Sequence, residues 1–175
     1  MNPLYVIYEH PLTEHLRLLI RLETIFLEIE KSLQLKENDF ATKNLFRLID
    51  LSDLVGGQDV RIELLKDLKK KGSALRSLVH NPDVNLALLE STLETIDRHK
   101  NKISAHKEIL STNFERDEFV QTVKRKYKIR GTLYQYELPV LNFWRSQDPN
   151  YHREKLEDWI QDFLPICQSV KLIMK

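Results

Sequence analysis

The chain has little of the residues on which small, cross-linked or irregular folds depend. Its 175 residues include one cysteine, four glycines and six prolines. The single cysteine, Cys167, cannot form an internal disulfide, which is typical of a reducing cytoplasm. A chain of this length buries about two-thirds of the surface that it exposes when unfolded, so it needs neither a disulfide nor a metal to fold. We therefore expect one domain, and a mainly helical one because leucine and isoleucine dominate and glycine is scarce.

Long apolar runs are also missing. No segment approaches the roughly 20 apolar residues of a membrane-spanning helix. The apolar run at residues 4–8 is too short for a signal peptide, and no basic residue precedes it. A cytoplasmic protein without a membrane span is therefore predicted. The net charge is only +1, so no global field marks the chain as a nucleic-acid or membrane binder.

Sequence motifs for catalysis or cofactor binding are absent. None of the six histidines lies four residues from another, and no cysteine pair accompanies them, so we predict no metal site. The sequence has no glycine-rich phosphate loop and no nucleophile elbow. Cys167 is expected in the core, and nothing in the sequence points to a base that would activate it. We therefore predict no enzymatic activity and no cofactor.

Helical periodicity accounts for most of the chain. Thr13 is a suitable N-cap for a first helix, in which Leu19, Leu22, Phe26 and Ile29 belong to one apolar stripe. In two later helices Leu78, Val79 and Leu86 are expected to face inward. The same reasoning predicts helices at about 38–55, from residue 59, at about 85–103, at about 117–127, at 139–144, and from residue 151 to the end with a break at Pro165.

Two short segments predict strands, at residues 4–8 and 133–137. The first is rich in β-branched and aromatic residues, and the second alternates in polarity. Two short strands do not form a stable sheet in water, so we expect that more chain or a partner completes it. The predicted fold class is mainly α (α+β), with a bundle-like helical domain and a small β-domain.

The first predicted helix carries two arginines on the side opposite its apolar stripe. Arg17 and Arg21 lie one turn apart there, and Glu14 precedes them. As structural residues they would contribute little, because a surface ion pair is worth about 0 to 1 kcal/mol. An exposed guanidinium is well suited to binding a carboxylate or backbone carbonyl of a partner.

A second group of cations lies between residues 98 and 130, where ten basic residues accompany four acidic ones. The densest part is KRKYKIRG at 124–131. One interpretation is a solvated helix end whose cations suit the negative end of the helix dipole. Another is an anion-binding face for nucleic acid or an acidic protein segment. Tyr127 is the one aromatic residue in the run, whereas base stacking usually needs several.

Four segments resemble the ZapD family of bacterial cell-division proteins, which is associated with FtsZ. They occur in the same order as in the family, and the match covers nearly all of the chain. These segments are EHPLTEHLRLLIRLE at 9–23, DVRIELLKDL at 59–68, YELPVLNFW at 136–144 and HREKLEDWIQDFLP at 152–165.

This resemblance implies a non-enzymatic protein of septation. Proteins like this one are cytoplasmic homodimers at the midcell division site. They bind the C-terminal tail of FtsZ and bundle its filaments, which promotes and stabilises the Z-ring. The whole chain, 1–175, is expected to be one ZapD-like domain. Family members continue with further strands, so the small β-domain is expected to be incomplete here.

The resemblance also implies where the partner binds. Arg21 matches the family motif, and Arg17 lies one turn earlier. The basic segment matches the family only in being basic. It supplies the remaining candidates, which are Arg116, Lys124, Arg125, Lys128 and Arg130. The rival interpretation is a helical nucleic-acid-binding protein that uses residues 124–130, although no nucleic acid is expected for a ZapD-like protein.

Overall fold

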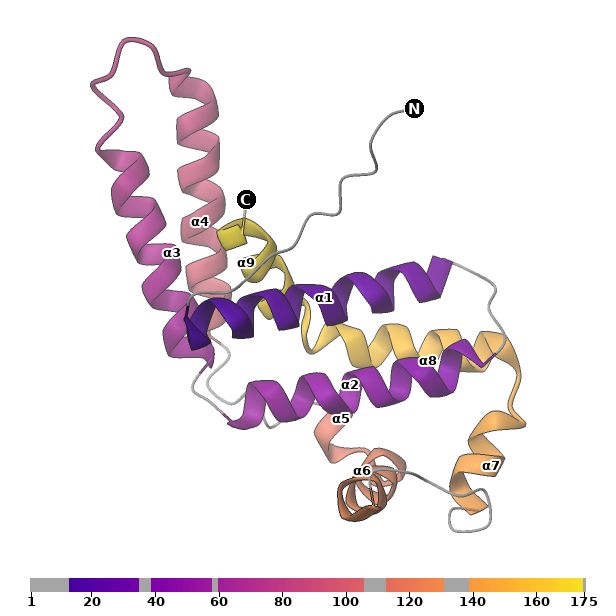
Figure 1. The fold of residues 1–175 in the computed structure, drawn as a ribbon. Coiled ribbons are helices and arrows are strands. Elements are labelled where there is room, and N and C mark those ends of the chain that lie inside the picture. Colours follow the sequence, from indigo (N-terminus) through magenta and orange to yellow (C-terminus); the bar gives the residue numbers. More distant parts are fainter. Residues whose placement is uncertain (1–12, 35–38, 58–59, 106–112, 131–138, 175) are drawn as a thin grey trace, which may run out of the picture.

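A computed structural model describes residues 13–34, 39–57, 60–105, 113–130 and 139–174 (Figure 1). Within these ranges the regular structure is helical, and it contains no strand. The two predicted strands, at 4–8 and 133–137, lie outside the described residues, and the described residues do not support a small β-domain. The helices are α1 (Glu14–Gln34), α2 (Phe40–Gly57), α3 (Val60–Arg76), α4 (Leu86–Ala105), α5 (Asn113–Arg116), α6 (Glu118–Arg130), α7 (Pro139–Arg145), α8 (Pro149–Gln161) and α9 (Leu164–Met174).

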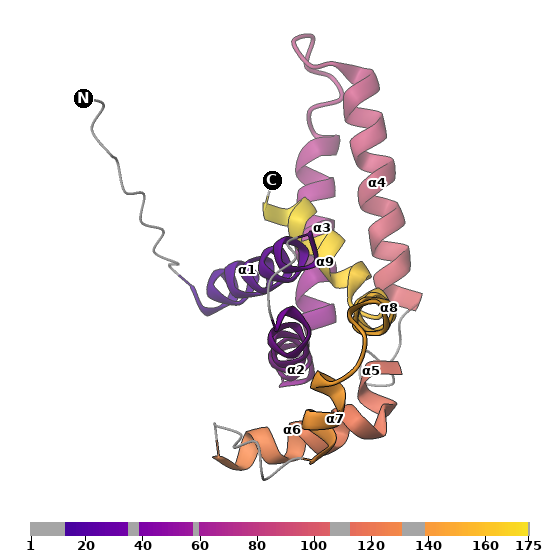
Figure 2. The ribbon, with the colours of Figure 1, turned by 90° about the vertical axis from the view of Figure 1, so that its right-hand side faces the viewer.

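The hydrophobic core draws buried residues from all of the described helices. Helix α2 packs between α1 and α8, and α9 packs against α1 and the α3–α4 pair (Figures 1 and 2). The predicted stripe of α1 is confirmed, because Leu19, Leu22, Phe26 and Ile29 are all buried. Cys167 is buried on α9, as expected. The predicted break near Pro165 is also confirmed, since α8 ends at Gln161 and α9 begins at Leu164.

Helices α3 and α4 form an antiparallel hairpin whose far end extends beyond the other described elements (Figures 1 and 2). Near the body, Gly72 of α3 is buried opposite Ile96 of α4. Lys71 donates to the carbonyls of Leu172 and Ile173 at 2.6 and 3.4 Å, and so it satisfies the last turn of α9. The base of the hairpin is therefore fixed against α9.

The prediction that three apolar residues face inward is wrong. Leu78, Val79 and Leu86 are exposed, as is Leu88, and we call these four residues the hairpin tip. Helix α3 ends at Arg76, before the first two of them, and a turn follows. Because no other described element reaches the hairpin tip, apolar spacing along the sequence did not correspond to burial there.

The lower part of the molecule in Figure 1 consists of α5, α6 and α7. The short helix α5 was not predicted. Asp117 follows it and caps α6, because its carboxylate accepts from the backbone N–H groups of Phe119 and Val120 at 2.9 and 3.3 Å. None of the described helices combines the length and the apolar character that a membrane crossing requires.

Candidate functional site

The two arginines of α1 are exposed, as the sequence predicts. Nη1 of Arg17 lies 2.6 Å from a carboxylate oxygen of Glu14, in an ion pair open to solvent. Such a pair contributes about 0 to 1 kcal/mol, so it leaves the guanidinium available for exchange onto a partner's carboxylate. Arg21 lies one turn further along the same helix.

Asp50 of α2 interacts electrostatically with Arg21 on α1 and with Tyr127 on the basic helix α6. Burial raises the pKa of the Asp50 carboxyl, while the nearby Arg21 lowers it. On α6, burial raises the pKa of Tyr127, and the Asp50 charge raises it further. Asp50 therefore interacts electrostatically with α1 and with α6. In Figure 2, α1, α2 and α6 follow one another down the molecule. The fold thus places the two cationic groups of the sequence on either side of α2.

Within the basic segment, Lys124 has an internal role. Its ammonium lies 2.5 Å from Glu115, 2.7 Å from the Ser52 hydroxyl and 3.1 Å from Asp53, and its side chain is only 12% exposed. Gln121 donates to the backbone and side chain of Glu115 at 2.6 and 3.0 Å. This network joins α5 and α6 to α2. Lys124 is therefore unsuited to direct contact with a partner.

Tyr127 is also used internally. Its ring stacks on that of Phe46 with centroids 4.9 Å apart. It is therefore not free to stack on a nucleobase, which removes the aromatic support for the nucleic-acid interpretation.

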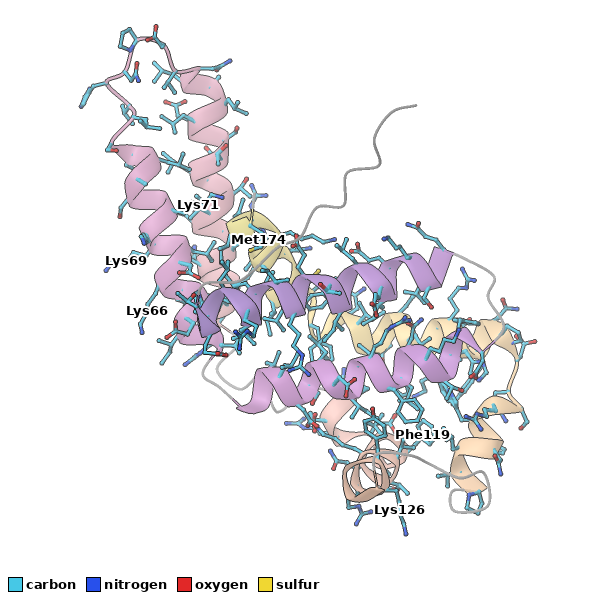
Figure 3. All side chains as sticks on the ribbon, in the orientation of Figure 1. Lys66, Lys69, Lys71, Phe119, Lys126 and Met174 are labelled. Carbon is cyan, nitrogen blue, oxygen red and sulfur yellow. The ribbon has the colours of Figure 1, made fainter. Side chains whose placement is uncertain are left out.

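Other basic residues of this region point outward. Arg116 on α5 and Arg125 and Lys126 on α6 are exposed, and Figure 3 shows Lys126 at the outer edge of the molecule. Lys128 and Arg130 belong to the last turn of α6, but their side chains lie outside the described set. We use the name cationic surface for the exposed members of the predicted set, which are Arg17, Arg21, Arg116 and Arg125. Lys128 and Arg130 stay candidates from the sequence alone.

Neither metal binding nor thiol chemistry is indicated in the described ranges. They contain no group of three or more histidine, cysteine, aspartate or glutamate side chains that could hold a metal ion. Burial raises the pKa of the Cys167 thiol to about 11, which keeps it protonated and unreactive at neutral pH.

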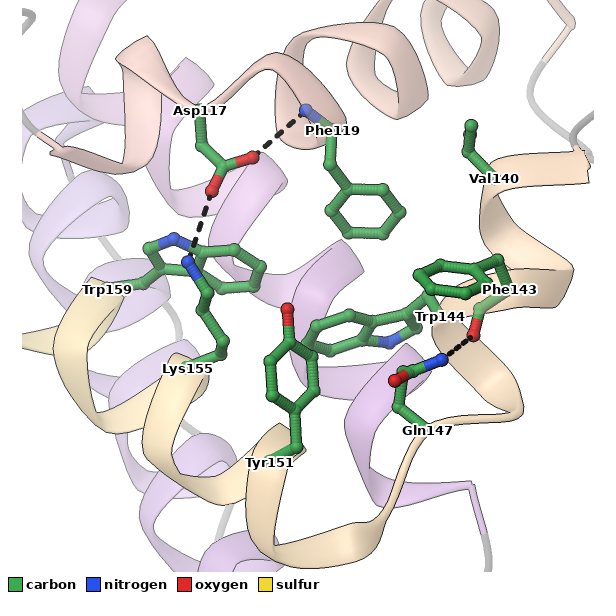
Figure 4. Close-up of a pocket in the computed structure, with 9 residues that line it drawn as sticks. All are labelled: Asp117, Phe119, Val140, Phe143, Trp144, Gln147, Tyr151, Lys155 and Trp159. Carbon is green, nitrogen blue, oxygen red and sulfur yellow. Dashed lines mark hydrogen bonds and ion pairs between the residues drawn. The ribbon is translucent and has the colours of Figure 1, made fainter.

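One feature was missed by the sequence analysis, namely a cavity of about 230 Å³ between α6, α7 and α8 (Figure 4). We call it the aromatic pocket. The spacing of aromatic residues indicated helical stripes, but not that stripes from three helices converge. Only the concentration of rings between residues 119 and 159 hinted at it. Its principal lining residues are Phe119, Val140, Phe143, Trp144, Tyr151 and Trp159.

Comparison with known proteins relates the chain to one family. Residues 20–175 match the family model of ZapD, described as a cell division protein. The chain belongs to the ZapD family, and this membership supports a role in cell division and septation.

Individual relatives are distant in sequence but match along almost all of this chain. Cell division protein ZapD of Aromatoleum aromaticum is 25% identical over 168 residues, covering 96% of this chain and 66% of the relative. The protein of the same name from Nitrosomonas europaea is 28% identical over 170 residues, covering 97% and 64%. That of Methylococcus capsulatus is 27% identical over 169 residues, covering 97% and 66%. The chain thus spans slightly less than two-thirds of the length of these relatives.

Proposed function

We propose that this protein binds the C-terminal tail of FtsZ, crosslinks FtsZ filaments, and so promotes the assembly and stability of the Z-ring at midcell. Membership of a cell-division family supports the proposal. The observation that carries it is the exposure of cations from distant parts of the sequence, Arg17 and Arg21 on α1 and Arg125 on α6. A flexible tail with carboxylates could be held there by guanidinium groups in bidentate contacts.

Exposed cations fit a reversible contact better than a permanent one. Arg17 and Arg21 keep most of their hydration, and the Arg17–Glu14 pair is easily exchanged. A single site of this kind is weak. Neighbouring tails on a filament raise the effective concentration for a second contact, so weak sites suffice for crosslinking when one particle carries two of them.

A twofold homodimer would supply the two sites, and we infer that the hairpin tip forms its contact. Leu88 is 66% exposed and Leu86 is 51% exposed at the end of the hairpin. A second copy packed there would bury both and would complete a four-helix arrangement from two hairpins. The two cationic surfaces would then lie on opposite bodies of the dimer.

The test is co-sedimentation of polymerised FtsZ with this protein. We expect the wild type to increase the amount of FtsZ that pellets at low speed, and Arg21→Glu to abolish the increase while leaving the circular dichroism spectrum unchanged. Lys69→Glu is the matched control, because Lys69 is exposed on the outer side of α3, away from α2 (Figure 3). Undiminished pelleting with Arg21→Glu would remove Arg21 from the binding surface.

A nucleic-acid-binding function receives less support. It relied on residues 124–130, of which Lys124 and Tyr127 are engaged inside the protein. Gel-shift measurements with duplex and single-stranded DNA separate the two functions, since a DNA binder would show a steep dependence of affinity on salt.

A further inference from the structure

The aromatic pocket is built on a rigid wall of rings. Trp144 stacks on Phe119 and on Trp159, with centroids 5.1 and 5.4 Å apart. The backbone carbonyl of Trp144 lies 2.6 Å from Nε2 of His152, which ties the end of α7 to α8. Both tryptophans are buried. The wall is therefore preorganised, and a ligand would not have to order it on binding.

An apolar rim surrounds the wall. Phe143 is 68% exposed, and Val140 and Tyr151 are exposed beside it. Figure 4 shows these side chains around the same cavity as the two tryptophans. Single exposed apolar residues are ordinary, but a cluster around an apolar hollow is typical of a site that another molecule covers. Aromatic residues are also enriched at such sites.

The volume of the aromatic pocket limits the size of the ligand that it can hold. Small-molecule and cofactor sites usually measure roughly 300–1,000 Å³. The aromatic pocket holds about 230 Å³, which suits one aromatic or branched aliphatic side chain. With the exposed rim around it, this size favours a side chain delivered by a polypeptide over a free cofactor.

Two of the polar groups at the pocket are donors with capacity for an outside acceptor. The Asp117 carboxylate already accepts from two backbone N–H groups of α6, and it lies 3.8 Å from the Lys155 ammonium. That ammonium also lies 5.9 Å from the Trp159 ring, and at this distance from Asp117 it keeps N–H groups for another acceptor. The pocket therefore complements an apolar group that is followed by an anion.

Trp144 provides a second donor. Its side chain is 96% buried, since the residue is only 4% exposed, and no described residue accepts a hydrogen bond from its Nε1. A buried N–H without a partner is costly and usually indicates a missing acceptor. In Figure 4 Gln147 lies beside this indole edge, and its amide donates to the Phe143 carbonyl at 3.1 Å.

We propose that the aromatic pocket is a docking site for a partner polypeptide in which an aromatic or branched aliphatic side chain is adjacent to an acidic residue. The apolar side chain fills the cavity against Trp144 and Trp159. The acidic residue binds the Lys155 ammonium, and a peptide carbonyl accepts from Trp144 Nε1. This site is separate from the cationic surface, and it does not depend on FtsZ being the partner.

The probes are three dipeptides, acetyl-Phe-Asp-amide, acetyl-Phe-Lys-amide and acetyl-Ala-Asp-amide. They are titrated into the ¹⁵N-labelled protein while the two tryptophan indole N–H resonances are followed. Trp144→Phe assigns the resonance of Trp144. We expect acetyl-Phe-Asp-amide to shift it saturably at about 1 to 10 mM, the range for one side chain and one ion pair. The other two dipeptides should bind at least about 5-fold more weakly, because each lacks one of the two interactions.

Two further substitutions at the rim of the pocket extend the test. Lys155→Gln should no longer prefer the Phe-Asp dipeptide over the Phe-Lys dipeptide, since the ammonium is lost while the cavity and the Asp117 carboxylate remain. Phe143→Ala should weaken both. Equal binding of all three dipeptides to the wild type, or no saturable shift with any of them, would overturn the proposal. A Trp144 resonance that moves with protein concentration alone would overturn it too, because a second copy would then be the occupant.

Discussion

The Lys124 ammonium lies 2.5 Å from the Glu115 carboxylate in a site where both side chains are largely shielded, 12% and 13% exposed. Ser52 of α2 hydrogen-bonds to the same carboxylate and to the same lysine. A charge pair of this kind is weak evidence of net stabilisation, but removing one partner leaves the other charge buried. Lys124, one of the predicted partner-binding residues, forms a contact between α6 and α2 instead.

Lys124→Met should therefore destabilise the protein by about 3 kcal/mol, because it removes a shielded charge that contacts Glu115, Ser52 and Asp53 together. Arg125→Met is the matched control, since this exposed neighbour should change stability by no more than about 0.5 kcal/mol. Urea denaturation followed by circular dichroism measures both. Equal effects of the two substitutions would contradict the assignment.

Stability should decrease at alkaline pH because of Cys167. Burial raises the pKa of its thiol from 9.0 to about 11, so the unfolded chain loses this proton at lower pH than the folded one. The contribution of the thiol is complete below pH 9 and is lost as the pH rises to about 11, which amounts to about 2 to 3 kcal/mol.

Cys167→Ala isolates this effect from other groups that titrate in the same range. The difference in unfolding free energy between wild type and variant should shrink between about pH 9 and pH 11. Urea denaturation at several pH values measures it. Two parallel pH profiles would show that the thiol ionises equally in both states.

FtsZ bundling should weaken as salt rises from about 0.05 to 0.3 M, because the Debye length falls over this range and exposed charge contacts are screened. The quantity to measure is the FtsZ that pellets with this protein beyond the amount that pellets alone at the same salt. Bundling that is insensitive to salt would indicate a mainly apolar contact instead of the cationic surface.

Leu88→Glu should convert a dimer into monomers. Light scattering should give about twice the chain mass of 20.8 kDa for the wild type and the single mass for the variant. Leu27→Glu on α1 is the control, since Leu27 is also an exposed leucine but lies outside the hairpin tip. A monomeric wild type would remove the basis for crosslinking by two identical sites.

The helical part of the fold was predictable because its signals are local. Leu22, Phe26 and Ile29 recur at the helical period, and all three are buried. Local periodicity does not reveal whether another element covers a stripe, and for this reason Leu78 and Leu86 were misplaced. Their exposure depends on how far the hairpin extends beyond the body.

The candidate site was predictable only as a set of residue types. Arg17 and Arg21 could be assigned to the outer side of α1, because that side is defined by the helix itself. Lys124 and Arg125 look equivalent in the sequence, yet Lys124 contacts Ser52, which is 72 residues away. Such long-range pairs decide which cations remain available, and they depend on the tertiary structure.

In the proposed dimer, the hairpin would set the distance between the filaments that the protein crosslinks. Helix α4 has 20 residues and is therefore about 30 Å long. Two copies that pair through their hairpin tips would hold their bodies apart by rigid struts, and the gap between neighbouring filaments would follow from helix length. Inserting or deleting whole turns in α3 and α4 together would then widen or narrow that gap in discrete steps, as with an adjustable spacer.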